Sequence, residues 1–173
     1  MATSLKKFYW CSCTWLALIQ DEIVVAGGVA ESRGSLCRAV IKVAAQGGAE
    51  IYTSGLSLVE VCKPKVNGDV AGEDLVKDFF ENDYIVIVAV DRQVGEIGRT
   101  LMRSGYPGLK PMDASHIAAA IVSRVDELHT FDDAVLNLDN KIDRLDGKKL
   151  RICKPALGGV PLPLLETASG EET

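Results

Sequence analysis

The amino-acid sequence predicts an α/β fold, a sandwich in which helices cover a mostly parallel central sheet. Three observations support this class. Short apolar segments typical of strands alternate with longer segments whose apolar residues recur at helical spacing. The length of 173 residues, 47% of them hydrophobic, suits one domain with a substantial core. Residues 84–90 are β-branched and apolar at successive positions, as in a central parallel strand covered by helices on both faces.

The first half of the chain contains patterns for two strands and three helices. The aromatic and apolar run around Trp10 predicts a buried first strand. Apolar residues at helical spacing predict the longest of the three helices, which ends at Gly47-Gly48. The third helix ends before Pro64, because the residue preceding a proline resists the helical conformation. In chain order, we expect a strand at 7–13, helices at 14–20 and 32–46, a strand at 50–54 and a helix at 56–62.

The second half continues the alternation and ends in a tail. Asn67-Gly68 and Gly72 mark a loop, and glycine and proline occur together in a second break at 105–108. Residues 1–155 therefore form one domain. Residues 156–173, which contain Gly-Gly, two prolines and a Ser-Gly-Glu-Glu ending, form a flexible C-terminal tail. The expected elements are helices at 73–82, 91–104, 113–124 and 133–138, and strands at 84–90, 127–130 and 149–153.

Charge and cysteine content restrict the class of protein. The net charge of −5 gives no global basic field that would attract nucleic acid, so a nucleic-acid enzyme of this composition needs metal ions to offset its carboxylates. Five scattered cysteines favour reduced thiols. Gln20-Asp21-Glu22 stand where a signal peptide would need a cleavage site, and no segment reaches the roughly 20 apolar residues that span a bilayer. We therefore expect a soluble cytoplasmic protein that does not enter a membrane.

Three acidic residues, far apart in the sequence, lie near the expected ends of strands. Glu60 follows the strand at 50–54, Asp113 opens a long helix, and Asp132 follows the strand at 127–130. Ligands of open α/β sheets bind at the carboxyl ends of the strands, so these acids can meet at one edge. Clustered carboxylates repel one another unless a cation lies among them, and carboxylate oxygens suit Mg²⁺ or Mn²⁺.

Each acid also has a purely structural interpretation. Ser57 and Glu60 have the spacing of a capping box, in which Glu60 would only bond back to the start of its helix. Asp113 is a favoured type of N-cap residue, and Asp132 and Asp133 compete for the N-cap of the next helix. A small α/β protein whose acids are only helix caps is therefore one alternative.

Five segments together resemble the PIN domain, the metal-dependent ribonuclease fold shared with VapC-type toxins of toxin–antitoxin pairs. They are FYWCSCTWLALI (8–19), TSGLSLVEV (53–61), PMDASHIAAAIVSRVDEL (111–128), HTFDD (129–133) and KLRICKP (149–155). The resemblance implies a three-layer α/β/α sandwich and cleavage of RNA with Mg²⁺ or Mn²⁺. It also implies a cognate antitoxin as partner and pairing as a homodimer.

The resemblance assigns candidate roles residue by residue. Glu60, Asp113 and Asp132 match the metal-binding acids of the family, and Asp113 with Glu60 would hold the ion directly or through water. Thr130 matches the hydroxyl residue before the last acid, and Ser12 matches the small polar residue after the first acid. Cys11 stands where that first acid is expected. A thiol is mostly neutral at pH 7 and is a poor ligand for Mg²⁺, so we expect weaker metal binding and reduced cleavage.

Other interpretations of these residues remain open. A non-catalytic PIN-like module that binds RNA or a protein would also tolerate Cys11. Cys11 and Cys13 with His116 are a further candidate, for a zinc site, if a strand places both sulfurs on one side. His116 and His129 are otherwise expected on helix and strand surfaces, and Trp10 and Trp15 in the core or in a dimer interface. The cations available for RNA phosphates are Arg33, Arg38, Lys42, Lys63, Lys65, Arg99, Arg103 and Lys110.

Overall fold

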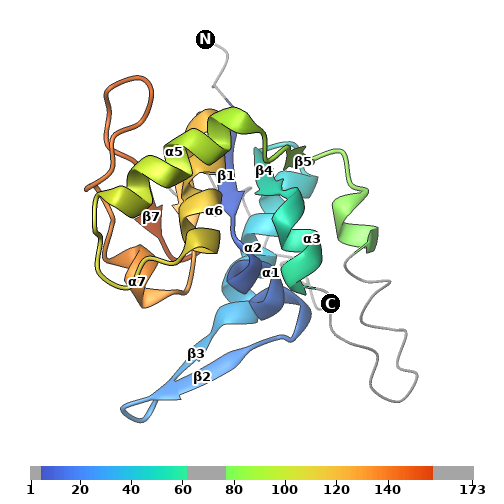
Figure 1. The fold of residues 1–173 in the computed structure, drawn as a ribbon. Coiled ribbons are helices and arrows are strands. Elements are labelled where there is room, and N and C mark those ends of the chain that lie inside the picture. Colours follow the sequence, from blue (N-terminus) through green and yellow to red (C-terminus); the bar gives the residue numbers. More distant parts are fainter. Residues whose placement is uncertain (1–4, 62–76, 158–173) are drawn as a thin grey trace, which may run out of the picture.

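Five parallel strands form the central sheet, in the order β5-β4-β1-β6-β7 (Figure 1). The computed structural model describes residues 5–61 and 77–157. All four strand pairings of this sheet are parallel, which confirms the mostly parallel sheet expected from the sequence. The strands are β1 (Lys6–Trp10), β4 (Ala49–Ser54), β5 (Ile85–Val88), β6 (Glu127–His129) and β7 (Arg151–Cys153).

Helices cover both faces of the sheet and make three layers. Because successive residues of a strand point to opposite faces, Tyr9 of β1 packs with α5 and α6, whereas Phe8 and Trp10 pack with α1 and α2. Trp10 and Trp15 are fully buried in the second of these clusters, which confirms their expected place in the core. The helices are α1 (Ser12–Ile19), α2 (Arg33–Ala45), α3 (Gly55–Val61), α5 (Arg92–Arg103), α6 (Pro111–Val122) and α7 (Asp133–Leu136).

Three features of the sequence prediction lie wholly or partly outside the described residues. The expected loop at 67–72 lies among residues 62–76, which are not described, and only residues 77–80 of the expected helix at 73–82 are seen as helical. The expected tail lies outside the described residues from residue 158 onward. None of the helices described at 5–61 and 77–157 is long and apolar enough to cross a membrane.

Two strands differ from their predicted form. β5 is an edge strand, which among the described residues pairs with β4 alone, and the side chain of Ile87 is 46% exposed. The prediction of a central strand was wrong because a β-branched, apolar run also suits an edge strand with one buried face. β1 ends at Trp10 instead of continuing to residue 13, because α1 begins at Ser12 with Cys11 as its N-cap. Cys11 and Cys13 therefore do not share one side of a strand.

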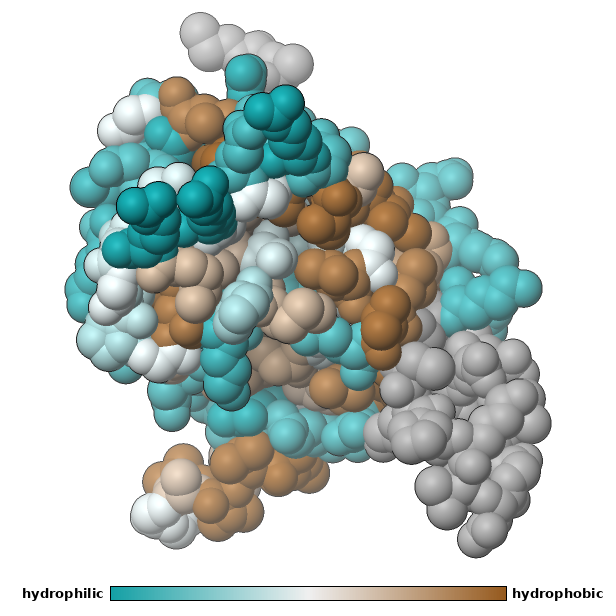
Figure 2. All heavy atoms as spheres, viewed as in Figure 1, coloured by the Kyte–Doolittle hydropathy of each residue, from teal (hydrophilic) through white to brown (hydrophobic). Residues whose placement is uncertain are grey.

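A β-hairpin that the sequence analysis did not predict projects from the α/β sandwich between α1 and α2 (Figure 1). Its strands β2 (Ile23–Ala26) and β3 (Val29–Ser32) are antiparallel and are joined by Gly27 and Gly28. Both glycines have positive φ values, 59° and 79°, as the two central residues of a type I′ turn require. Ile23, Val25 and Val29 are 62–71% exposed, and the hairpin is largely hydrophobic in Figure 2.

Candidate functional site

A pocket of about 380 Å³ lies at the carboxyl ends of β1 and β6 and beside α3 and α6. This is the edge at which parallel sheets bind ligands. The lining of the pocket includes Cys11, Ser12, Glu60, Asp113, Thr130 and Asp132. The structure thus brings together all six residues that the sequence singled out as candidate site residues.

Glu60 points into the pocket and does not complete a capping box. α3 begins at Gly55, so Ser57 lies inside the helix, where its buried hydroxyl bonds to Thr53 Oγ1 at 2.8 Å. The carboxylate of Glu60 accepts a hydrogen bond from Ser12 Oγ, and its Oε2 lies 2.7 Å from His116 Nε2. The capping-box interpretation of Ser57 and Glu60 was therefore wrong.

His116 is buried at the centre of a hydrogen-bond network, so the expectation that it lies on a helix surface was wrong. Its Nδ1 lies 2.9 Å from the hydroxyl of Tyr9, whose pKa is raised by burial. Because Tyr9 keeps its proton, its hydroxyl can donate to Nδ1, and an N–H at Nε2 can donate to the Glu60 carboxylate. Ser12 Oγ also lies 3.1 Å from Nε2. This network fixes the orientation of the Glu60 carboxylate.

Asp113 and Asp132 combine capping with a place in the pocket. Asp113 is the third residue of α6, three positions after the N-cap Lys110, and its Oδ2 accepts from the backbone N–H of Lys110 at 3.2 Å. Asp132 is the N-cap of α7, and its Oδ1 accepts from the N–H groups of Ala134 and Val135 at 2.8 and 3.2 Å. Capping and lining the pocket are therefore compatible roles for these two acids.

The electrostatics of the pocket favour a cation. Burial raises the pKa of Asp113, and the negative charge of Asp132 raises it further. Each of these effects penalises the ionised carboxylate, and a divalent ion between the acids would relieve both. The residues present therefore fit a hard divalent cation bound by carboxylate oxygens.

Cys11, at the position where the sequence analysis expected the first acid, is a neutral thiol. Cys11 is buried, and its Sγ lies 3.0 Å from Cys13 Sγ and 3.3 Å from Thr130 Oγ1. Its hydrogen bond with Cys13 and its burial raise the pKa of Cys11 well above the ordinary value. The same hydrogen bond, together with those of Thr130 and the Phe131 amide, lowers the pKa of Cys13. Cys11 therefore contributes no negative charge to the pocket at neutral pH.

Among the described residues, one group of side chains has potential ligand atoms close enough together to share a metal ion. It comprises Glu127, His129 and Cys153, whose ligand atoms lie within 4.8 Å of one another. The trio Cys11, Cys13 and His116 does not meet this spacing, and His116 is engaged with Tyr9 and Glu60. The zinc interpretation of that trio therefore has no support from the geometry. The three pocket acids do not meet the spacing either, so an ion among them would reach at least one acid through water, as Mg²⁺ commonly does.

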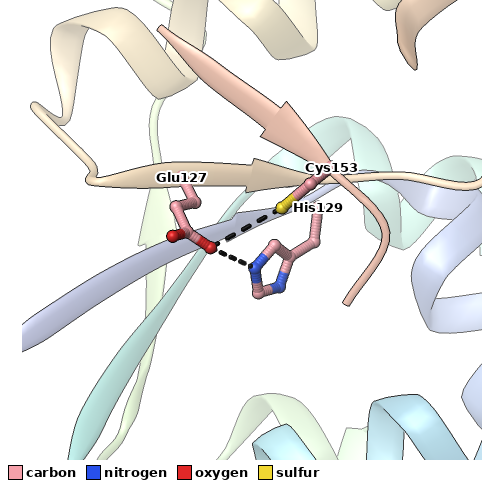
Figure 3. A group of neighbouring side chains, drawn as sticks. All are labelled: Glu127, His129 and Cys153. Carbon is pink, nitrogen blue, oxygen red and sulfur yellow. Dashed lines mark hydrogen bonds and ion pairs between the residues drawn. The ribbon is translucent and has the colours of Figure 1, made fainter. Parts of the chain in front are cut away.

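The group at Glu127 is a hydrogen-bond network (Figure 3). His129 Nε2 lies 3.2 Å and Cys153 Sγ 3.6 Å from Glu127 Oε2, while Trp10 Nε1 donates to His129 Nδ1 at 3.1 Å. An indole N–H can only donate, so Nδ1 accepts and the proton of the neutral imidazole lies on Nε2, facing Glu127. Burial lowers the pKa of His129 and raises that of Cys153 to about 12. His129 thus has no lone pair for a metal at Nε2. The sequence analysis expected His129 on the surface, which was wrong because the residue is fully buried.

The cations proposed as RNA contacts fall into three groups: those in ion pairs, those outside the described residues, and the remaining exposed ones. Arg33 bonds to Glu22 and Glu31 and lies over the ring of Phe131 at 4.8 Å, so its charge is used within the fold. Arg38 forms an ion pair with Asp21. Lys63 and Lys65 lie outside the described residues. The remaining members, Lys42, Arg99, Arg103 and Lys110, are exposed, as is Arg38.

Comparisons with known proteins define the class. The sequence model of the PIN domain matches residues 30–141, and the chain therefore belongs to the PIN domain family. The matched segment includes Glu60, Asp113, Thr130 and Asp132 but begins after Cys11. The correspondence of Cys11 to the first acid rests on its place at the end of β1.

A solved structure gives the particular resemblance within this class. The fold is similar to the crystal structure of VapC20 from Mycobacterium tuberculosis, described as a sarcin-ricin loop cleaving toxin, with a TM-score of 0.52 and 16% sequence identity. The alignment covers 73% of this chain and 90% of VapC20. At this identity the likeness concerns the fold, and it agrees with the three-layer sandwich expected from the resemblance. No curated protein matches the sequence.

Proposed function

We propose that the protein is a toxin-type, metal-dependent endoribonuclease that hydrolyses RNA phosphodiester bonds, with activity reduced by Cys11. The observation that carries the proposal is the convergence of Glu60, Asp113 and Asp132 on one pocket at the carboxyl edge of a PIN-domain sheet. The description of VapC20 as a toxin that cleaves the sarcin-ricin loop supports RNA as the class of substrate.

The residues of the pocket would bind one Mg²⁺ or Mn²⁺ ion and hold the ion where it can contact RNA. When bound, such an ion lowers the pKa of a coordinated water and neutralises charge on the phosphate. Asp113, Glu60 and Asp132 would hold it. Ser12 and His116 fix the carboxylate of Glu60, and backbone N–H groups fix those of Asp113 and Asp132. The ligands are thus oriented by hydrogen bonds before an ion arrives.

Cys11 weakens this arrangement without disrupting it. A neutral thiol supplies neither the charge nor the oxygen that a hard cation prefers, so the pocket keeps three acids where the family pattern has four. Because the sulfur is held by Thr130 and Cys13, the fold around the pocket remains intact. We therefore expect binding of Mn²⁺ or Mg²⁺ at reduced affinity and slow cleavage.

Replacing Cys11 by aspartate tests the proposal. Cys11→Asp restores the missing carboxylate, and Cys11→Asn is a control of the same shape without the charge. With Mn²⁺ and a structured RNA, we expect Cys11→Asp to cleave at least about tenfold faster than Cys11→Asn, because lesser changes around metal sites alter activity 10–100-fold. Its thermal stability should also rise more with Mn²⁺, since a ligand at 100 times its Kd adds about 2.7 kcal/mol. Equal inactivity of the two variants, with no metal-dependent shift, would contradict the proposal.

A second change separates the metal role of Asp132 from its capping role. Asparagine is as good an N-cap as aspartate but carries no charge. In the Cys11→Asp background, Asp132→Asn should therefore abolish cleavage while urea denaturation stays nearly unchanged. Cleavage by Asp132→Asn at the rate of the Cys11→Asp parent would show that Asp132 acts only as a cap.

The alternative function is a non-catalytic module that binds RNA or a protein, and the thiol at residue 11 favours it. Inactivity of Cys11→Asp combined with retained RNA binding would establish this alternative. In either case, the partners that we propose are a cognate antitoxin and a second copy of the chain. Light scattering of the chain alone and in complex with a co-expressed antitoxin measures both associations.

A further inference from the structure

Two cysteines face each other at one wall of the pocket. Cys11 is the N-cap of α1, Cys13 is the second residue of that helix, and their Sγ atoms are 3.0 Å apart. Because Ser12 is already helical, the Cα atoms of residues 11 and 13 lie about 5.4 Å apart from helix geometry alone. Disulfides span Cα separations of roughly 4.4–6.8 Å. The backbone therefore allows a bond between the two sulfurs with little movement.

The surroundings of the two sulfurs give them different roles. Cys13 is partly exposed and its Sγ lies 3.3 Å from the hydroxyl of Thr130 and 3.4 Å from the amide N–H of Phe131, both of which can donate to a thiolate. Cys11 is buried beneath it and points toward the carbonyl of His129 at 3.5 Å. The lowered pKa of Cys13 agrees with this polarity. Cys13 is thus the attacking thiol and Cys11 the resolving thiol.

The other described cysteines lack this combination. Burial raises the pKa of Cys37 and of Cys153, each to about 12, which keeps both as unreactive thiols. Cys153 Sγ lies 3.6 Å from the Glu127 carboxylate, which also disfavours a thiolate. Among the described cysteines, a reactive pair therefore occurs only at residues 11 and 13.

We propose that Cys11 and Cys13 are a redox site that forms a reversible intramolecular disulfide by exchange with a small-molecule disulfide such as oxidised glutathione. The Cys13 thiolate attacks one sulfur of glutathione disulfide, whose S–S bond breaks and releases one glutathione thiolate. Cys11 then loses its proton to solvent, attacks the Cys13 sulfur and expels the second glutathione. Two protein thiols are oxidised and one disulfide is reduced to two thiols.

The proposed bond would lie beside a candidate metal ligand. Both sulfurs contact Thr130 Oγ1, which accepts a hydrogen bond from the backbone N–H of Asp132 at 3.1 Å. Oxidation removes both S–H groups at the position of the first family acid and changes the contacts of Thr130. Because the site is defined by thiol chemistry, it stands or fails independently of RNA cleavage.

The test uses the full chain and a peptide that trypsin releases. Residues 8–33, between the cleavage sites at Lys7 and Arg33, contain Cys11 and Cys13 but none of the other three cysteines. The protein is equilibrated with excess oxidised glutathione, quenched in acid, alkylated with N-ethylmaleimide, digested and weighed by mass spectrometry. We expect this peptide to carry no maleimide and to weigh two hydrogen atoms less than the reduced, unalkylated peptide. Dithiothreitol should reverse the change. Two maleimide groups on the peptide, or a link from it to another cysteine, would overturn the proposal.

Single variants test the order of attack. Cys11→Ser should trap Cys13 as a mixed disulfide with glutathione, because the resolving thiol is absent. Cys13→Ser should leave Cys11 unmodified, because its sulfur is buried. Cys153→Ser, which changes a thiol outside the pocket, is the matched control and should keep the intramolecular bond. Equal glutathionylation of Cys11→Ser and Cys13→Ser would refute the assigned roles.

Discussion

His116 shows, at the scale of single residues, how one buried side chain organises the candidate site. It lies on α6 and contacts Tyr9 of β1 and Glu60 of α3, so three elements meet at one imidazole. A buried polar group without a partner destabilises a protein by about 1–3 kcal/mol. The contacts of His116 therefore contribute to stability as well as to the orientation of Glu60.

Removing this imidazole should destabilise the protein. His116→Ala removes the imidazole that contacts the Tyr9 hydroxyl and the Glu60 carboxylate and opens a cavity, so we expect the free energy of unfolding to fall by about 2–4 kcal/mol. Ser115→Ala, at a partly exposed position of the same helix, removes only the hydrogen bond from Oγ to Pro111 O and should alter it by less than about 1 kcal/mol. Urea denaturation at pH 7 measures both. Equal stability of the two variants would show that the network contributes nothing to folding.

The sequence predicted the acids of the pocket but not its histidine. Glu60, Asp113 and Asp132 could be placed because the carboxyl ends of parallel strands meet at one edge. His116 could not, because helical periodicity marks one buried face, whereas α6 is buried on most of its circumference. The partner of its Nδ1, Tyr9, is 107 positions away along the chain, and no local pattern indicates that contact.

At the scale of elements, the predicted strands and helices that fall within the described residues exist with ends shifted by a few residues, and the hairpin is the element that was not predicted. α6 begins two residues before the predicted start, since Pro111 suits the first position of a helix. The hairpin β2–β3 was missed although its two glycines between short apolar runs are a strong turn signal. β5 was assigned to the centre of the sheet because strand order depends on contacts between distant segments, which composition does not encode.

The turn of the hairpin provides a prediction at this scale. Gly27 and Gly28 both need positive φ, and a Cβ on either would meet no atom within 4 Å. The effect of a substitution on stability therefore depends on backbone strain alone. Gly28→Ala should destabilise the hairpin by about 1–2 kcal/mol, the penalty for a left-handed alanine. Gly27→Asn is the control, because Asn-Gly is a preferred type I′ turn.

Hydrogen exchange distinguishes these variants, because the projecting hairpin can open without unfolding the sheet. The amides of Ala26 and Val29, the pair that closes the two-residue turn, should exchange about five- to thirtyfold faster in Gly28→Ala than in the parent chain. In Gly27→Asn the rates should stay close to those of the parent. Equal acceleration in both variants would contradict the assigned turn.

At the scale of the whole molecule, the three layers bury titratable groups that link folding to pH. Fully buried His129 packs between β1 and β7, where Phe8 stacks on its ring at 4.6 Å and Trp10 donates to Nδ1. Burial lowers the pKa of His129 in the folded state. The hydrogen bond between Glu127 and His129 lowers the pKa of Glu127. The pKa of Asp113 is raised instead, so its titration changes stability in the opposite direction.

The stability of the molecule should therefore fall on mild acidification, and the sign follows from proton counts. Below the unfolded pKa of about 6.5, His129 is protonated in the unfolded chain but stays neutral in the fold, so the unfolded state binds more protons. For one such group, the free energy of unfolding falls by at most about 1.4 kcal/mol per pH unit. His129→Gln removes this titration and keeps an oxygen acceptor for Trp10. Urea denaturation between pH 7 and 5, above the range in which glutamates titrate, should give a shallower slope for His129→Gln than for the parent. Because Asp113 is present in both proteins, its effect cancels in the difference, and parallel curves would show that His129 is protonated equally in the folded and unfolded states.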